Sequence, residues 1–463
     1  MVVLYDTLAR ARVDVTPADG RALTVYSCGP TVYRYAHIGN LRTFLMADLI
    51  RRTFEYTGVE VHQIQNITDV GHMTDELTDS GRDRMELAAE VEGRSPEEIA
   101  GFYTEAFLVD IDAFNIRRAR DYPRASEHIP HMLELIVKLL EREHAYEVDG
   151  TVYFDVTTFT RYGALSGNTL DALHADHRKV IGDTKKRHHA DFVLWKAAGP
   201  ARQMRFQSPW GEGYPGWHIE CSAMSMAAFG EGFDLHTGGE DNVFPHHEDE
   251  IAQSEGAVGH QVVRHWTHGA HLLSEGRKMS KSVQNVYDLR DLEQRGHRDP
   301  LAARLLFLQS RYRAQMNFTL DALAGADTTL ARWRRHVADW DAGTTGNDDL
   351  AGKYEQRFVE AITDDLDTPA AVALLAEVMS SDALSHGDRT ALARRWDRVL
   401  GLDLARDAGA SVDVPSEVAE LLEQRERARE TKDYAEADRL REAIRAQGFD
   451  VEDTPGGPEI RSR

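Results

Sequence analysis

The segment LTVYSC at residues 23–28, followed by AHIGNLRTFLMADLI at 36–50 and VEVHQIQNI at 59–67, decides the fold. The first and third pieces are rich in β-branched and aromatic residues, which is typical of buried strands. Apolar residues recur between them at helical spacing, and Asn40 is the expected N-cap of that helix. This succession predicts a βαβ unit in a parallel sheet. Ligands of such sheets bind at the carboxyl ends of the strands, where the loop with His37 is expected to lie.

The rest of the chain predicts an inserted segment and a helical second half. Residues 152–156 and 192–195 are predicted strands of the insertion, and the Gly- and Pro-rich stretch at 208–216 marks its end. Beyond Pro300 the pattern predicts helices without strands, ending in a charged helix pair at 418–444.

Composition excludes several classes of protein. The chain has 463 residues, 42% of them hydrophobic, which predicts about three folded domains. Its 54 lysines and arginines against 77 aspartates and glutamates give a formal charge of −23, so a nucleic-acid partner needs a local basic patch. No stretch is apolar enough to span a membrane, and residues 1–16 carry charges where a signal peptide is apolar. Because only Cys28 and Cys221 occur, we expect a cytoplasmic protein.

The loop His37-Ile38-Gly39-Asn40 is a candidate anion site. A helix N-terminus offers free N–H groups and a partial positive charge, which together can hold a phosphate. Gly39 lets a nucleotide approach the backbone, and His37 can donate to a phosphoryl oxygen. By itself the loop fits equally a histidine that precedes an ordinary helix.

A second candidate is the run Lys278-Met279-Ser280-Lys281-Ser282. Nucleotidyl transfer needs mobile cations where negative charge develops, and two lysines on a flexible loop supply them. A solvated surface loop has a similar composition. An HIGN loop followed far along the chain by this run is, however, a more specific sign of nucleotidyl transfer than either motif alone.

Both cysteines and an acidic, histidine-rich segment form a candidate metal site. His246 and Glu250 are four residues apart, so on a helix that starts near Pro245 they share a face. A set of two cysteines, one histidine and one glutamate suits zinc. His247 lies three residues from Glu250 and is the alternative ligand, and buried cysteines also occur simply as small apolar residues.

Together these motifs resemble the cysteinyl-tRNA synthetases, a family of class I aminoacyl-tRNA synthetases, along nearly the whole chain. The matching stretches are LYDTLAR at 4–10, YSCGPTVY at 26–33, HIGN at 37–40, NITDVGHMTD at 66–75, DFVLWK at 191–196, GWHIECSAM at 216–224, FPHHEDEIAQS at 244–254 and KMSKS at 278–282.

The resemblance implies roles for individual residues. The implied zinc ligands, for one ion per chain, are Cys28, Cys221, His246 and Glu250. The implied cysteine pocket includes Thr68, Trp217 and His236. The implied ATP and catalytic residues are His37, Gly39, Asn40, Lys278 and Lys281, with Mg²⁺ accompanying ATP. The implied substrates are L-cysteine, ATP and tRNA(Cys), and we expect a monomer.

The resemblance also implies an α/β fold with a Rossmann-like parallel-sheet catalytic domain, an insertion, an all-α bundle and a small C-terminal domain. The expected ranges are 1–125 and 208–238 for the catalytic domain, 126–207 for the insertion, 239–320 for a stem-contact region with KMSKS, 321–405 for the bundle and 406–463 for anticodon binding. The last domain carries an arginine-rich helix pair, which fits equally a solvated amphipathic pair.

Two positions depart from the family pattern. The first signature motif is often HIGH, whereas in this chain its fourth residue is Asn40. Asparagine also has a hydrogen-bond donor but has no imidazole ring. A glycine-rich run before FPHH carries Thr237, whose Cβ is expected near the adenosine or amino-acid site.

The expected chemistry follows from the difference between cysteine and serine, which is one atom. Size discrimination alone yields about 1 to 3 kcal/mol, whereas zinc prefers a soft thiolate to a hydroxyl. Four protein ligands describe a closed site, so the substrate thiolate adds as a fifth ligand or displaces a weak one, for which Glu250 is the candidate.

Three other functions compete with this one. The first is a related ligase that joins cysteine to an amino sugar in thiol biosynthesis, which lacks a tRNA-binding end; residues 300–463 argue against it. A zinc-dependent nucleic-acid module lacks the expected basic charge. A simpler nucleotidyltransferase does not need Cys221 or the HHEDE segment.

Overall fold

The computed structural model describes residues 1–70, 73–75, 80–170, 184–200, 202–279, 285–340, 346, 348–406, 415–454 and 457–462. The chain divides into two compact units, Met1–Ala405 and Arg406–Arg463. No helix in the described ranges is long and apolar enough to cross a membrane.

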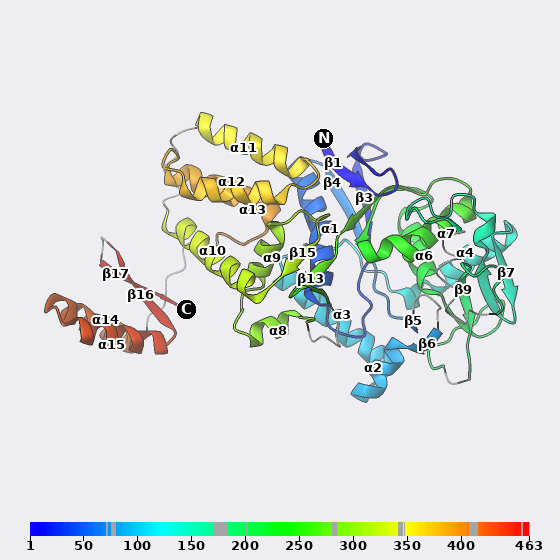
Figure 1. Cartoon of the computed structure of the whole chain (residues 1–463), viewed down its shortest axis with the longest axis horizontal. Helices are drawn as coiled ribbons and strands as arrows, with labels where there is room; N and C mark the ends of the chain where they lie inside the picture. Colours follow the sequence, from blue (N-terminus) through cyan, green and yellow to red (C-terminus); the bar gives the residue numbers. More distant parts are fainter. Residues whose placement is uncertain are drawn as a thin grey trace. The chain divides into compact units, whose positions relative to one another are not determined.

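A four-stranded parallel sheet lies at the centre of the first unit (Figure 1). Its strand order is β12 (Val263–Gly269), β11 (Phe233–Gly239), β3 (Ala22–Ser27) and β4 (Glu60–Gln65). The helix α1 (Ile38–Tyr56) joins β3 to β4, which confirms the predicted βαβ unit and the Rossmann-type fold. Because β11 and β12 come after the insertion, the sheet takes its edge strand β12 from the range 239–320 that was predicted to be the stem-contact region.

The start of α1 differs from the prediction. His37, not Asn40, is the N-cap, and its Nδ1 accepts a hydrogen bond from the backbone N–H of Asn40 at 3.2 Å. The Asn40 Oδ1 in turn accepts from the backbone N–H of His37 at 3.1 Å. Asn40 therefore closes a reciprocal capping box from inside the first turn, which the usual preference for asparagine at the cap concealed.

The insertion forms an antiparallel sheet with a helix against it. The strand order is β10 (Gly213–Pro215), β9 (Phe192–Ala197), β8 (Thr151–Phe154) and β7 (Ala145–Val148), preceded by α4 (Ile129–Glu141). Its apolar side chains share a core with α6 (Trp217–Phe229) and α7 (Glu248–Val258), beside which it lies in Figure 1. The strands predicted at 152–156 and 192–195 are thus present with small shifts.

The remaining elements of the first unit are short sheets and helices. They are β1 (Val2–Asp6), β2 (Ala11–Val15), β5 (Met73–Asp75), β6 (Ser80–Asp83), α2 (Arg84–Glu92), α3 (Pro96–Ala113), β13 (Leu272–Ser274), β14 (Arg277–Lys278), α8 (Leu289–Gln294), α9 (Pro300–Leu308), β15 (Met316–Phe318), and the bundle α10 (Leu320–Asp339), α11 (Asp348–Thr363), α12 (Thr368–Ser380) and α13 (His386–Leu400). The prediction of no strands beyond Pro300 is wrong, because β15 pairs in parallel with β13. The strand β15 is only three residues long, so it is too short to show the alternation of apolar and polar residues by which a strand is predicted.

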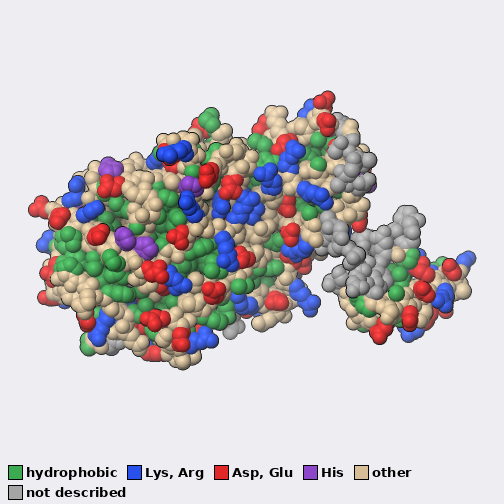
Figure 2. Space-filling view, turned by 180° about the vertical axis from the view of Figure 1, so that it is seen from behind, with side chains coloured by type: hydrophobic (Ala, Val, Ile, Leu, Met, Phe, Trp, Pro, Cys, Tyr) green, Lys and Arg blue, Asp and Glu red, His purple; other side chains and the backbone are tan. Residues whose placement is uncertain are grey.

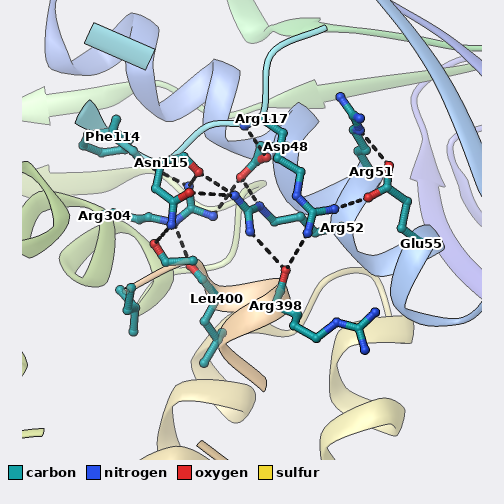
Figure 3. A network of polar contacts seen from close by, with 12 residues as sticks. Asp48, Arg51, Arg52, Glu55, Phe114, Asn115, Arg117, Arg304, Arg398 and Leu400 are labelled. Carbon is teal, nitrogen blue, oxygen red and sulfur yellow. Dashed lines mark hydrogen bonds and ion pairs between the residues drawn. The ribbon is translucent and has the colours of Figure 1, made fainter. Parts of the chain in front are cut away.

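A buried network of Asp48, Arg52 and Arg304, here called the arginine network, joins α1 to α9, α13 and the end of α3 (Figure 3). The Asp48 Oδ2 accepts from Arg52 Nε and from Arg304 Nη2, each at 2.8 Å. Arg304 also donates to the carbonyls of Leu400 at 2.6 Å and Asn115 at 2.8 Å. Gly401 caps α13 with φ of 65°, and a Cβ there would lie 2.6 Å from Arg304 Nη2, so only glycine fits beside the guanidinium.

The second unit is a helix pair with a hairpin. It contains α14 (Ser416–Glu430), α15 (Tyr434–Ala446), β16 (Phe449–Thr454) and β17 (Gly457–Ser462), and the hairpin is a second departure from the strand-free prediction. Acidic and basic side chains are interspersed on the face shown in Figure 2. Several arginines of the pair are engaged in ion pairs: Arg425 and Arg429 with Asp453, Arg427 with Glu423, Arg439 with Glu436, and Arg445 with Glu442.

Candidate active site and metal centre

A cavity of about 360 Å³ opens at the carboxyl ends of the parallel strands. It is lined by the loop after β3, the start of α1, the turn after β11 and the segment after β12. His37, Gly39 and Asn40 all line it, together with Cys28 and Trp217. The site therefore lies where an open α/β sheet places its ligands.

His37 presents a neutral ring to the cavity. Burial, with a smaller contribution from the charge of Arg34, lowers the pKa of His37 to about 4. Because its Nδ1 accepts the backbone N–H of Asn40, the ring proton resides on Nε2. A neutral histidine with a fixed tautomer can donate to a phosphoryl oxygen without adding charge of its own.

A side chain at Gly39 would displace that of Met279. A Cβ at this position would come within 2.3 Å of the methyl carbon of Met279, which also lines the cavity. The run that carries Met279 thus reaches the HIGN loop. The backbone of Lys278 ends β14, while Lys281 lies outside the described residues.

Four of the predicted metal ligands lie together and are here called the thiol cluster: Cys28, Cys221, His246 and Glu250. Their ligand atoms all lie within 4.8 Å of one another. Cys28 follows β3, Cys221 lies on α6, and the other two flank the start of α7. The side chains of Cys221, His246 and Glu250 are almost fully buried.

Second partners orient His246. Its Nδ1 lies 2.8 Å from His218 Nδ1, which leaves Nε2 to face Glu250 Oε1 at 3.0 Å. His218 in turn lies 3.4 Å from Asp249. The regular helix α7 begins at Glu248 after an irregular turn with an extended residue at Phe244, yet His246 and Glu250 share a face as predicted.

His247 points to the same place. Its Nε2 lies 3.1 Å from Cys28 Sγ, and its Nδ1 lies 2.7 Å from His268 Nε2. Cys28, His236, His247 and Glu250 form a second set of ligand atoms within 4.8 Å. The two sets share Cys28 and Glu250, so the geometry keeps His247 as an alternative donor.

The charges of the cluster suit a cation. Burial raises the pKa of Glu250, but His236 and His246 outweigh burial and lower it to about 2. The hydrogen bond that the Cys221 thiol donates to Cys28, together with burial, raises the pKa of Cys221 well above its usual range. Thiols that are costly to ionise when buried ionise readily on a metal ion, which supplies the missing positive charge.

The donor set fits zinc. Glu250 Oε1 is buried and, among the described residues, accepts no well-directed hydrogen bond. Two sulfurs, one ring nitrogen and one carboxylate oxygen are ligands that zinc takes in tetrahedral sites. An unsatisfied buried carboxylate oxygen beside two thiols is the feature that a bound cation explains.

The residues expected in the cysteine pocket divide into two layers. Trp217 lines the cavity, and its ring centroid lies 4.5 Å from that of His246. His236 is fully buried behind it, with Nε2 3.0 Å from Glu250 Oε2 and its ring stacked on Trp266. Thr68 is also buried, and its hydroxyl accepts from Asn66.

Thr237 does not enter the cavity. Its side chain is buried and its hydroxyl donates to Ser27 Oγ at 2.8 Å on the neighbouring strand. Strand alternation turns this side chain to the opposite face of the sheet from that of His236, and the closeness of its Cβ to a bound substrate stays a prediction.

Sequence reasoning missed several residues of the cavity. Tyr33, Arg34, Arg84, Asp241 and His271 line it beside the predicted ones. Arg34 stands three residues before His37, and a basic residue so near a candidate phosphate loop was a usable signal. Arg84 gave no such signal because it is brought in by the start of α2.

The fold and site define a class I aminoacyl-tRNA synthetase. The structure of Mycobacterium tuberculosis methionyl-tRNA synthetase in complex with methionyl-adenylate shares the fold with a TM-score of 0.54 at 16% identity, covering 87% of this chain and 94% of that one. The family described as "tRNA synthetases class I (C) catalytic domain" matches residues 14–328, and "Cysteinyl-tRNA ligase anticodon binding domain" matches residues 411–461.

Curated relatives narrow the class to one family. The chain is 45% identical to the cysteine–tRNA ligase of Salinibacter ruber over 99% of this chain and 98% of that protein. It is 44% identical to the Thermus thermophilus cysteine–tRNA ligase, with 99% of each chain covered. The chain belongs to the cysteine–tRNA ligase family, which confirms the resemblance and sets aside the amino-sugar ligase and the other two alternatives.

Proposed function

We propose that this chain activates L-cysteine with ATP and transfers it to the 3′ end of tRNA(Cys). One observation carries the proposal: the four ligand atoms of the thiol cluster converge within 4.8 Å, and Cys28 also lines the cavity with His37. This convergence supports a soft metal site beside a phosphate loop, as the joining of a thiol amino acid to a nucleotide requires.

Cys28, Cys221, His246 and Glu250 hold one zinc ion in this proposal. When bound, zinc supplies a soft Lewis acid that favours the substrate thiolate over a serine hydroxyl. His236 gives Glu250 a second partner at 3.0 Å, so the carboxylate stays held if the substrate takes its place. Trp217, with Thr68 and His236 behind it, shapes the cysteine pocket.

Adenylate formation uses the other side of the cavity. The cysteine carboxylate attacks the α-phosphate, the bond to the β-phosphate breaks, and pyrophosphate leaves. Gly39 admits the nucleotide, His37 and Asn40 donate to it, and Lys278 and Lys281 neutralise charge that develops on the phosphates, with Mg²⁺ accompanying ATP. The terminal ribose hydroxyl of the tRNA then attacks the carbonyl, and AMP leaves.

The domain assignments remain part of the proposal. Ranges 1–125 and 208–238, together with the edge strand β12 from 239–320, act as the catalytic domain, 126–207 as the insertion, the rest of 239–320 as the stem-contact region and 321–405 as the bundle. The unit Arg406–Arg463 binds the anticodon, and the enzyme acts as a cytoplasmic monomer. Because most arginines of α14 and α15 already have acidic partners, contact with tRNA phosphates requires some of these ion pairs to exchange.

Cysteine-dependent exchange of pyrophosphate into ATP tests the proposal, with serine as the matched control and zinc measured in the same preparation. We expect exchange with cysteine, no exchange with serine, and about one zinc per chain. Equal exchange with both amino acids would refute the thiol-selective site, and cysteine activation without charging of tRNA(Cys) would refute the transfer step.

A further inference from the structure

Tyr33, Arg34 and Arg84, here called the Tyr33 cluster, form part of the cavity wall. The guanidinium carbon of Arg34 lies 5.2 Å from the Tyr33 ring centroid, and that of Arg84 lies 5.7 Å from it. Arg84 Nη1 also donates to the Tyr33 hydroxyl at 2.9 Å. One aromatic ring thus holds two cations beside the predicted phosphate loop, and Arg84 fixes the ring.

The half-buried Arg34 differs in its partners from three buried arginines of this unit. Arg42, Arg52 and Arg304 spend their N–H groups on carbonyls and carboxylates of the fold. For Arg34 the described part of the chain provides a ring contact and no ion pair. A half-buried guanidinium without a carboxylate is costly to keep, unless a ligand supplies the anion.

Charge is unevenly distributed around the cavity. Glu240 and Asp241 come from the turn after β11, and Asp241 lies 3.1 Å from His271 Nε2. The two cations of the Tyr33 cluster come from the loop after β3 and the start of α2. An anionic group in the cavity is repelled by the first segment and attracted by the second, so this polarity orients it toward Arg34.

We propose that Arg34, held by Tyr33 and Arg84, is a phosphate-binding residue of the cavity that takes a phosphate group of a bound nucleotide. The planar fork of a guanidinium matches two oxygens of one phosphate, which a lysine cannot match. Because the ring restrains the guanidinium beforehand, less conformational entropy is lost on binding. The inference rests on the proposed function for its two sources of phosphate: the triphosphate of ATP and the terminal phosphodiester of the tRNA.

The test compares Arg34→Ala and Arg34→Lys with the wild-type enzyme. Arg94→Ala is the matched control, because Arg94 also covers an aromatic ring, with its guanidinium 4.6 Å from Phe102, and does not line the cavity. One assay gives the KM for ATP in pyrophosphate exchange. A second gives the KM for tRNA in transfer from preformed adenylate, and a calorimetric titration with ATP and with pyrophosphate measures binding directly.

Arg34→Ala is expected to raise one of the two KM values by about 10- to 100-fold, the usual loss for a hydrogen bond to a charged group. Arg34→Lys recovers part of this loss, and Arg94→Ala changes neither value. A rise in the KM for ATP, with weaker binding of ATP and pyrophosphate, identifies the triphosphate; a rise confined to the transfer assay identifies the tRNA.

Two results separate this inference from the proposed function. Arg34→Ala kinetics equal to those of Arg94→Ala in both assays would overturn the role of Arg34 and leave cysteine activation intact. A wild-type enzyme that shows no cysteine-dependent exchange would refute the proposed function; the titrations then decide, because unchanged binding of ATP and pyrophosphate by Arg34→Ala overturns the inference and weakened binding supports it.

Discussion

The arginine network and the thiol cluster, both in the first unit, differ in whether their carboxylate oxygens accept hydrogen bonds. In the arginine network both carboxylate oxygens of Asp48 are satisfied, by Arg52, by Arg304 and by the backbone N–H of Arg117 at 3.0 Å. In the thiol cluster the Glu250 Oε1 accepts no well-directed hydrogen bond from the described residues, and the sulfurs of Cys28 and Cys221 lie within 4.8 Å of its ligand oxygen.

The difference separates a structural cluster from a ligand site. A polar group that is buried and fully paired has no capacity left for a ligand, and its energy goes into joining elements of the fold. A cluster that leaves ligand atoms unsatisfied is stable only when something else completes it. Apart from the half-buried Cys28, the residues of both clusters are buried, so pairing is the distinguishing observation.

The largest expected effect comes from Arg304→Met. The substitution leaves the carbonyls of Leu400, Phe114 and Asn115 with fewer donors and removes one of two cations from Asp48. Breaking such a buried pair costs about 3–5 kcal/mol of the free energy of unfolding, measured by urea denaturation.

Arg357→Met is the control for that variant. Arg357 pairs with Glu377 at the surface, at 3.1 Å, and its loss should cost less than about 1 kcal/mol. The zinc content of the Arg304 variant should stay at that of wild type while it is folded. If the Arg304→Met variant has the same free energy of unfolding as the Arg357→Met control, the arginine network contributes little to the packing of α1 against α9 and α13.

Cys221→Ser is expected to lower zinc content and activity while leaving the stability of the metal-free protein unchanged. Loss of one ligand sulfur should lower zinc affinity by more than about 100-fold, since even residues that only support a ligand cost 10- to 100-fold. Zinc content and cysteine-dependent exchange should fall together. With a chelator added to both proteins, the variant and the wild type should unfold at the same urea concentration; a large difference there would make Cys221 a packing residue.

Deletion of the unit Arg406–Arg463 removes neither cluster, because both lie in Met1–Ala405. Cysteine-dependent exchange and zinc content should therefore remain close to wild type. Charging of tRNA should fall through weaker binding, and the loss should depend on salt concentration if cations of this unit contact phosphates. Equal charging by the full-length and shortened chains would rule out a role of this unit in binding tRNA.

The smallest expected effect is the pH dependence of the arginine network. Burial raises the pKa of Asp48, but Arg52 and Arg304 outweigh burial and lower it below the usual value. A depressed pKa stabilises the fold above the unfolded value of about 3.9, and this stabilisation is lost as pH falls through the folded pKa. The difference in unfolding free energy between wild type and Asp48→Asn should thus stay constant from pH 7 to 5 and shrink below pH 4; a difference that grows in acid would contradict it.

Much of the fold could be predicted because its signals are local. The strand, helix and strand at residues 23–67 carry their own periodicity, and the i, i+4 spacing of His246 and Glu250 places both on one face. The short strand β15 could not be predicted, because its pairing with β13 is a long-range event.

The site was predictable in composition and less so in geometry. Spacing allowed either His246 or His247, and the structure shows why: each has its Nδ1 held by a further histidine, His218 or His268, and each turns Nε2 to the cluster. Such second partners leave no periodic trace in a sequence. The N-cap at His37 was missed because asparagine is the commoner N-cap residue, whereas here Asn40 occupies the third helical position and bonds back to His37.

The pairing of β3 with β11 has a consequence for the order in which the protein is made. Val25 of β3 pairs with Leu235 of β11, so a ribosome must deliver the whole insertion before that edge of β3 is covered. An open edge of a hydrophobic strand is a template for pairing with another chain. A polypeptide that terminates inside the insertion therefore lacks the cavity and exposes an unpaired strand edge that is prone to aggregation. Incomplete translation yields no active fragment.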